Sequence, residues 1–134
     1  LEFRRVLFRS ILFTGDGSIM MNIQELATVA DHDIDIKIVI VHNFILGMVG
    51  QWQRLFYNHH YSASELNLKR DFIKIAEAMG VPGYRLTKAE ELNDVLPEIL
   101  FSKGAAVIDV YVPQDENVIP MVPGGKRLDQ MVLS

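Results

Sequence analysis

The segment IKIVIV (36–41) decides the fold class of this chain. It is β-branched and almost continuously apolar, which is typical of a strand in a parallel sheet that is covered on both faces. Two further apolar segments also indicate buried strands. They are ILFT (11–14), after which Gly15 ends the strand, and AAVIDVYV (105–112). A shorter strand is expected within VPGYRLT (81–87). The sequence therefore predicts a sheet of mainly parallel strands.

Segments with helical spacing alternate with these strands. Ser18 is a candidate N-cap for a helix that ends near 31–33. The apolar residues expected on its inner face are Met20, Ile23, Leu26, Ala27 and Ala30. The second half of 46–57 indicates another helix, and 71–79 an amphipathic helix that Gly80 ends. The inner face expected for the latter is Phe72, Ile75, Ala76 and Met79.

The C-terminal third continues this alternation. Segment 88–101 indicates a helix in which Pro97 is expected to cause a kink or a restart. Segment 113–125 is expected to be irregular, and 128–133 to form a last helical turn. Strands that alternate with helices predict an α/β fold, a Rossmann-like parallel sheet with flanking helices and right-handed crossovers.

Composition narrows the class of protein. The length of 134 residues suits one small domain, and 49% hydrophobic with 22% charged residues is a globular composition. The net charge of −4 and the lack of a basic stripe argue against a nucleic-acid partner. The chain has no cysteine, which excludes disulfides and a thiol nucleophile. The lack of cysteine fits a cytoplasmic protein, which we expect. No apolar run approaches the roughly 20 residues needed to cross a bilayer.

Two polar motifs follow strands of the predicted sheet. GDG (15–17) follows the strand at 11–14, and HN (42–43) follows the strand at 36–41. In parallel sheets, ligands bind beyond the carboxyl ends of the strands, beside helix N-termini. Asp16 offers a carboxylate oxygen and Asn43 an amide oxygen, which suit Mg²⁺ held on a diphosphate. The alternative is that GDG is an ordinary turn and Asn43 only a cap.

The spacing of these motifs resembles a known signature. GDG, an interval of 24 residues (18–41) and HN resemble the GDG…NN signature of thiamine diphosphate enzymes. The stretches GDGSIMMNIQELATVA, KIVIVHNFILGMVGQWQRLFY, DFIKIAEAMG and VIPMVPGGKRLDQM resemble the C-terminal domain of the acetolactate synthase (acetohydroxyacid synthase) large subunit. GMVGQWQ and PMVPGG separate that family from most other thiamine diphosphate enzymes. The resemblance implies a truncated thiamine diphosphate-binding fold, the pyrophosphate domain, over 11–134, incomplete at its N-terminal side.

The resemblance also implies roles for single residues. The side chains of Asp16 and Asn43 and the backbone carbonyl of Ile45 would bind Mg²⁺. The cofactor would contact Gly15, Asp16, Gly17, Ser18, Asn43, Gly47, Met48 and Val49. Met48 would face the reactive ring and, with Trp52, line the substrate channel. No catalytic residue is expected in this chain, because the glutamate that activates the cofactor lies in the N-terminal domain of the family and acts across a subunit interface.

The implied reaction is the decarboxylative condensation of pyruvate with a second 2-keto acid, in the biosynthesis of isoleucine and valine. The family also binds FAD, outside this stretch, and forms homodimers or tetramers of large subunits, with or without a regulatory small subunit. A bacterial or archaeal source, no nucleic-acid or membrane partner, and an inactive isolated fragment are expected. The alternatives are a glyoxylate carboligase or pyruvate oxidase type of enzyme, and a noncatalytic Mg²⁺-diphosphate binding module.

Two residues depart from the family pattern. His42 replaces the first Asn of the NN pair, and a neutral imidazole can replace some hydrogen bonds of the amide. Gly50 stands where the family often has a bulky polar residue, and we expect it to loosen the start of the helix. Both leave the Mg²⁺ ligands in place, and Gly50 bears on the geometry of the substrate channel.

Other polar residues have ordinary interpretations. His59 and His60, with Tyr57 and Tyr61, are interpreted as a polar loop, with a metal site as the alternative. His32 is expected in solvent, and Glu25 in a polar contact. LEFRRVLFRS (1–10) reverse-translates into the end of a common sequencing adapter. We therefore predict that residues 1–10 are an artefact and not native protein.

Overall fold

The computed structural model describes residues 10–66 and 69–133. It divides the chain into two compact units, which are described separately. The sheet unit contains the described residues up to Phe44 and those from 69 to Val112, and the second unit contains 45–66 and 113–133. Apart from Ser10, the stretch 1–10 lies outside the described residues, so its artefactual origin stays a prediction.

The sheet unit contains four parallel strands in the order β1-β2-β4-β3. They are β1 (Ser10–Gly15), β2 (Ile36–His42), β3 (Gly83–Leu86) and β4 (Ala106–Tyr111). The register places Gly15 opposite Val41, and His42 opposite Tyr111, so β1, β2 and β4 end at the same edge. The predicted parallel α/β sheet is confirmed.

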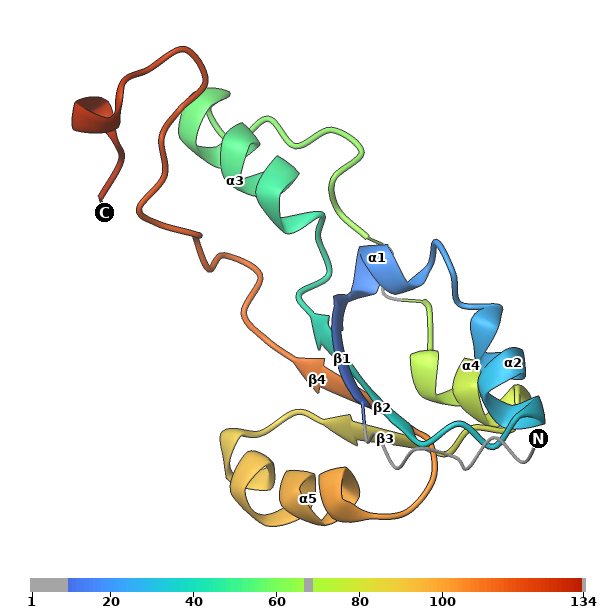
Figure 1. The fold of residues 1–134 in the computed structure, drawn as a ribbon. Helices are drawn as coiled ribbons and strands as arrows, with labels where there is room; N and C mark the ends of the chain where they lie inside the picture. The colour runs from blue at the N-terminus through green and yellow to red at the C-terminus, as the bar shows by residue number, and fades with distance from the viewer. Residues whose placement is uncertain (1–9, 67–68, 134) are drawn as a thin grey trace, which may run out of the picture. The chain divides into compact units, whose positions relative to one another are not determined.

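Helices cover both faces of this sheet (Figure 1). On one face lie α1 (Asp16–Ile19), α2 (Glu25–Asp31) and α4 (Phe72–Ala78), and on the other lies α5 (Ala89–Phe101). The first face buries Ile19, Leu26, Ile38, Ile40, Phe72, Ala76, Val81 and Val107. The second buries Val39, Leu86, Ile99, Ala106 and Ile108. Successive residues of β2 therefore alternate between the two cores, as strand geometry requires.

The first strand is more exposed than its sequence indicates. The strand predicted at 11–14 is confirmed as β1, but Ile11, Leu12 and Phe13 are 48%, 42% and 70% exposed, so the prediction that it is buried is wrong. The reason is the strand order, because β1 lies at an edge of the sheet while both cores are built around β2 and β4. An apolar strand can thus be central or peripheral with the same local pattern.

The helix predicted after Ser18 is two separate helices. α1 is a single turn that begins at Asp16, and Ser18 is an exposed residue inside it rather than its cap. Hydrogen bonds of i to i−3 type, such as the one from Met21 N to Ser18 O, tighten the chain between α1 and α2. This changes the helical phase, so Leu26 is buried but Met20 and Ala27 are exposed.

The two later helices of the sheet unit agree closely with prediction. Asp71 caps α4 by accepting hydrogen bonds from the amides of Ile73 and Lys74. Gly80, with φ of +83°, follows the end of α4 as expected. α5 runs without interruption through Pro97, so Pro97 does not restart the helix.

The second unit consists of one helix and irregular segments. α3 (Gly47–Phe56) is longer than predicted, because the first half of 46–57 is also helical. Gly50 does not loosen its start: the amide of Gly50 donates to the carbonyl of Leu46 over 2.8 Å. Segment 113–125 has no helix or strand, as predicted, and Leu128–Gln130 forms the 3₁₀ turn η1. Within 10–66 and 69–133, no helix is long and apolar enough to span a membrane.

Candidate functional site

The carboxylate of Asp16 is buried beyond the carboxyl end of β1 and is held by two backbone amides. Its Oδ1 accepts a hydrogen bond from Gly17 N and its Oδ2 accepts one from Phe44 N, each over 2.9 Å. Asp16 is only 3% exposed. Since Gly17 follows β1 and Phe44 follows β2, the carboxylate joins the ends of two neighbouring strands. The structure thus brings the two predicted motifs together.

Phe44 has a backbone conformation that its side chain disfavours. Its φ is +62°, in the left-handed region, which is uncommon for a bulky residue and is found at functional sites. The Phe44 ring lies 4.0 Å from the His42 ring and 4.9 Å from the Tyr111 ring, centre to centre. This packing holds the strained residue with its amide toward Asp16. Sequence reasoning missed Phe44, because a dihedral angle leaves no mark in the sequence.

His42 lies between two buried carboxylates. Its Nε2 is 3.5 Å from Asp16 Oδ2, and its Nδ1 is 2.8 Å from Oδ1 of Asp109. Asp109 lies in β4 and is fully buried. This contact fits the tautomer in which the Nδ1–H of His42 donates a hydrogen bond to Asp109, because an ionised carboxylate only accepts hydrogen bonds. The signal that could have revealed Asp109 is a single acid within the apolar strand sequence AAVIDVYV.

Arg85 extends these contacts to the start of α4. Its Nε donates to Asp109 Oδ2 over 3.3 Å, and its Nη2 donates to Asp71 Oδ1 over 2.7 Å. Partial burial lowers the pKa of Arg85, but the hydrogen bond to Asp71, the nearby Tyr111 and the hydrogen bond to Asp109 together outweigh it and raise the pKa above its ordinary value. Partial burial likewise raises the pKa of Asp71, but the Lys74 amide and Arg85 lower it overall. Both groups are therefore charged at neutral pH.

The other predicted site residues of the sheet unit lie at the same edge. Gly15 is the N-cap of α1, and Gly17 and Ser18 belong to its single turn. Asn43 is half-buried directly after β2 and one residue before Phe44. Because α1 has only four residues, its helix dipole contributes little to any ligand at this edge.

The donor set of the sheet unit fits a hard divalent cation. Each oxygen of Asp16 accepts one backbone hydrogen bond, which leaves lone pairs for a cation. The ion pairs of Asp16 and Asp109 in the described chain involve His42 and one permanent cation, Arg85, so negative charge is in excess. No group of three or more His, Asp or Glu side chains in that part of the chain could hold a metal. A cation here would therefore take few side chains, as Mg²⁺ on a phosphate does.

The remaining predicted residues lie in the second unit. Met48 and Val49 are 51% and 44% exposed in the first turns of α3 and can contact a ligand. Trp52 is half-buried, with its ring centre 5.2 Å from that of Phe56. Gly47 is the first residue of α3, and Ile45 is buried just before it.

Gly50 and Ile45 fit each other in this unit. A Cβ atom at position 50 would lie 2.4 Å from Cδ1 of Ile45. The Ile45 side chain therefore occupies the space that any side chain at position 50 would need. Glycine at position 50 is therefore explained by packing against Ile45. It does not make the helix irregular.

Gln51 anchors α3 to the irregular segment. Gln51 is 1% exposed, its Oε1 accepts from Val118 N over 2.7 Å, and its Nε2 donates to Val118 O over 3.1 Å. Nε2 also donates to Met121 Sδ over 3.3 Å. Sequence reasoning missed this residue, although a polar side chain on an amphipathic helix next to Trp52 was available as a signal.

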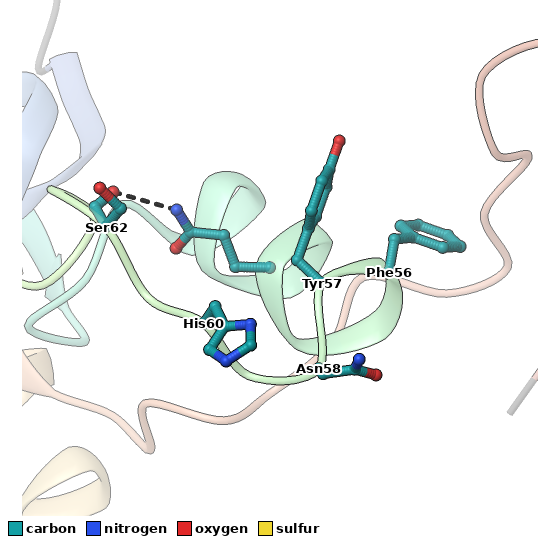
Figure 2. Close-up of a pocket in the computed structure, with 6 residues that line it drawn as sticks. Phe56, Tyr57, Asn58, His60 and Ser62 are labelled. Carbon is teal, nitrogen blue, oxygen red and sulfur yellow. Dashed lines mark hydrogen bonds between the residues drawn. The ribbon is translucent and has the colours of Figure 1, made fainter.

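A pocket of about 450 Å³ lies at the end of α3 and in the loop after it (Figure 2). Its lining consists of Gln53, Phe56, Tyr57, Asn58, His60 and Ser62. Gln53 Nε2 donates to the carbonyl of Ser62 over 3.0 Å, which ties the loop to the helix. The rings of His59 and Tyr61 are 6.3 Å apart. Since no metal-holding group of His, Asp and Glu occurs in the described residues, the alternative of a metal site at His59 and His60 finds no ligand set.

Comparisons with known proteins converge on one family. Residues 7–110 match the family model described as thiamine pyrophosphate enzyme, C-terminal TPP binding domain. The chain is 48% identical over 123 residues to the acetolactate synthase large subunit of Parasynechococcus marenigrum (strain WH8102), covering 91% of this chain and 20% of that protein. It is 39% identical over 122 residues to the acetolactate synthase isozyme 2 large subunit of Escherichia coli (strain K12), covering 91% and 22%.

A solved structure supports the same fold. The Rhodococcus jostii RHA1 thiamine diphosphate-dependent 4-hydroxybenzoylformate decarboxylase matches with a TM-score of 0.73 and 25% identity, over 81% of this chain and 20% of that one. The chain thus spans about a fifth of the length of the relatives it matches.

Proposed function

Since the chain belongs to the thiamine pyrophosphate enzymes and matches their C-terminal TPP-binding domain, we propose that it is the part of an acetolactate synthase large subunit that holds Mg²⁺ and the cofactor diphosphate. The observation that carries this proposal is the buried Asp16 carboxylate, fixed by the amides of Gly17 and Phe44 at the edge where β1 and β2 end. The identity of 39–48% to acetolactate synthase large subunits supports the choice of enzyme.

In this proposal the chain binds and orients the cofactor. The side chains of Asp16 and Asn43 and the carbonyl of Ile45 hold Mg²⁺. Gly15, Gly17 and Ser18 line the diphosphate, and Gly47, Met48 and Val49 lie along the cofactor. Trp52 and Met48 shape the place of the second substrate. When bound, the cofactor would supply the stabilisation of negative charge that decarboxylation needs, and the protein would supply binding and orientation.

The proposed activity is the condensation of pyruvate, with loss of CO₂, with a second 2-keto acid, as in the biosynthesis of isoleucine and valine. By the same resemblance, the activity would also use an activating glutamate and an FAD site outside the stretch 11–134, and a second large subunit. A regulatory small subunit is a further proposed partner. We therefore expect the isolated chain to be inactive, and its cytoplasmic location stays a prediction.

A chimera tests the proposal. Residues 11–133 replace the matching segment of the Parasynechococcus large subunit, which is 48% identical. We expect this chimera to form acetolactate from pyruvate. Asp16→Ala should raise the dissociation constant for Mg²⁺, measured by calorimetry with saturating thiamine pyrophosphate, by about 100-fold or more. The exposed Asp115→Ala is the matched control, and its affinity should not change.

Two results would contradict parts of the proposal. A folded chimera that binds Mg²⁺ and thiamine pyrophosphate but forms no acetolactate would count against acetolactate synthase and favour a sister enzyme or a binding module. Near-normal Mg²⁺ affinity in Asp16→Ala would show that Asp16 is not a metal ligand.

A further inference from the structure

His42 is a buried side chain with contacts on several sides, next to the proposed metal ligand. Its imidazole is in contact with the rings of Phe44, Phe72 and Tyr111, at centre distances of 4.0, 5.2 and 5.0 Å. Its backbone carbonyl accepts a hydrogen bond from Val112 N over 3.1 Å. The side chain is 6% exposed. With these neighbours on several sides, the ring has little freedom to rotate or shift.

Asp109 fixes the orientation of this ring. The hydrogen bond of 2.8 Å from His42 Nδ1 to Asp109 Oδ1 decides which nitrogen faces β4, so Nε2 must face Asp16. Asp109 is itself held on its other oxygen by Arg85 Nε, and Arg85 reaches the N-cap of α4 through Asp71. The contacts therefore run without interruption from α4 through β3, β4 and β2 to Asp16.

The same oxygen of Asp16 is contacted by two groups of one chain segment. Asp16 Oδ2 accepts a hydrogen bond from Phe44 N over 2.9 Å. The same oxygen lies 3.5 Å from Nε2 of His42, two residues before Phe44. A carboxylate that bound only the two amides could still tilt about the line that joins them. The imidazole lies against this oxygen, with Nε2 at 3.5 Å, and would restrict such a tilt.

We infer that His42 is a positioning residue for Asp16, and that Asp109, supported by Arg85, holds His42 in place for that task. The inference rests on the proposed role of Asp16 as an Mg²⁺ ligand. In metal sites generally, replacing a residue that orients a ligand lowers metal affinity by about 10- to 100-fold. His42, which stands in place of the first Asn of the NN pair, would thus position Asp16 through its imidazole. It does not act as a catalytic group.

The experiment uses the chimera and measures two quantities: the dissociation constant for Mg²⁺ with saturating thiamine pyrophosphate, and kcat at saturating Mg²⁺. His42→Phe keeps a ring among the three aromatic neighbours but removes both nitrogens. We expect it to weaken Mg²⁺ binding about 10- to 100-fold while kcat at saturating Mg²⁺ changes by less than about threefold. Asp109→Asn alone should weaken Mg²⁺ binding about tenfold. Added to His42→Phe, it should cause no further loss of Mg²⁺ affinity.

Lys37→Met is the matched control for loss of a buried charge. Lys37 is 2% exposed at the opposite end of β2, where Nζ donates to Asp35 Oδ1 over 3.1 Å and to the carbonyl of Gly104. We expect a lower melting temperature with unchanged Mg²⁺ affinity. If Asp109→Asn does not fold, Arg85→Lys replaces it, because lysine keeps the charge but cannot bond to Asp109 and Asp71 together as the guanidinium does. It should weaken Mg²⁺ binding in the same direction.

The outcomes separate this inference from the proposed function. Unchanged Mg²⁺ affinity in His42→Phe, together with a loss in Asp16→Ala, would overturn the inference alone. Equal effects of Asp109→Asn with and without His42 would also overturn it, because Asp109 would then act by another route. If Asp16→Ala itself has normal affinity, the metal assignment fails and the inference fails with it.

Discussion

Replacing Gly50 by alanine should destabilise the second unit, and replacing Ile45 by valine at the same time should relieve most of the loss. An alanine Cβ at position 50 would lie 2.4 Å from Cδ1 and 3.0 Å from Cγ1 of Ile45, whereas carbon atoms in contact are about 3.5–4.0 Å apart. Ile45 is 4% exposed, so its side chain cannot simply turn into solvent.

The magnitude is a balance of two effects. Overpacking of a buried site costs about 1–3 kcal/mol, while alanine is favoured over glycine in a helix interior by about 1 kcal/mol. We therefore expect Gly50→Ala to lower the free energy of unfolding by about 0–2 kcal/mol. Ile45→Val alone should lower it by about 0.5–1.5 kcal/mol. In the double variant the Cδ1 atom is gone, so the coupling between the two changes should be favourable by about 1–3 kcal/mol.

Urea unfolding of the 134-residue chain, followed by tryptophan fluorescence, measures this cycle. The sequence has one tryptophan, and Trp52 lies in α3 two residues after Gly50, so the signal reports on the correct unit. Additive free energies, within about 0.5 kcal/mol, would refute the packing argument. A Gly50→Ala variant that gains the full helix-propensity benefit would refute it as well.

Two further predictions concern Asp71, the N-cap of α4, and Gln51, the buried amide of α3. The folded-state pKa of Asp71 lies below its ordinary value of 3.8, so its ionised form stabilises the fold above that value and this contribution is lost as the pH falls below about 4. Asp71→Asn, which can still cap α4, should therefore make the free energy of unfolding less dependent on pH between about 5 and 2. An unchanged pH dependence in this range would contradict the contacts of the Asp71 carboxylate with the Lys74 amide and Arg85. Gln51→Ala removes the two hydrogen bonds that the buried Gln51 amide makes with the backbone of Val118. At about 0.5–1.5 kcal/mol for each hydrogen bond, it should lower the free energy of unfolding by about 1–3 kcal/mol, read from Trp52 fluorescence. The exposed Gln24→Ala is its control, and an equal small effect of both would argue against the anchor.

Local patterns predicted the elements well because they depend on neighbours in sequence. Continuous β-branched runs gave β2 and β4, and the apolar spacing of 71–79 gave α4 with its glycine stop. The same reasoning was wrong where one local sequence pattern is compatible with two different tertiary arrangements. The apolar strand β1 lies at an exposed edge, and the spacing after Ser18 is divided between α1 and α2 by a tightened turn.

The candidate site was half predictable. GDG and HN follow strands, and parallel strands end at one edge, so the sequence could place Asp16 near the segment at 42–44. It could not show that Phe44 adopts a left-handed conformation and gives its amide to Asp16. That arrangement depends on the packing of Phe44 against His42 and Tyr111, which belong to different strands.

The sequence by itself therefore determined the α/β class, the motif and the resemblance to acetolactate synthases, because these are written in residue types and short spacings. Only the tertiary structure decided the partners of the buried charges. His42 and Asp109 are 67 positions apart, and they meet because β4 lies next to β2 in the order β1-β2-β4-β3. Strand order is set by the best burial of all helices and strands together, so no local pattern contains it.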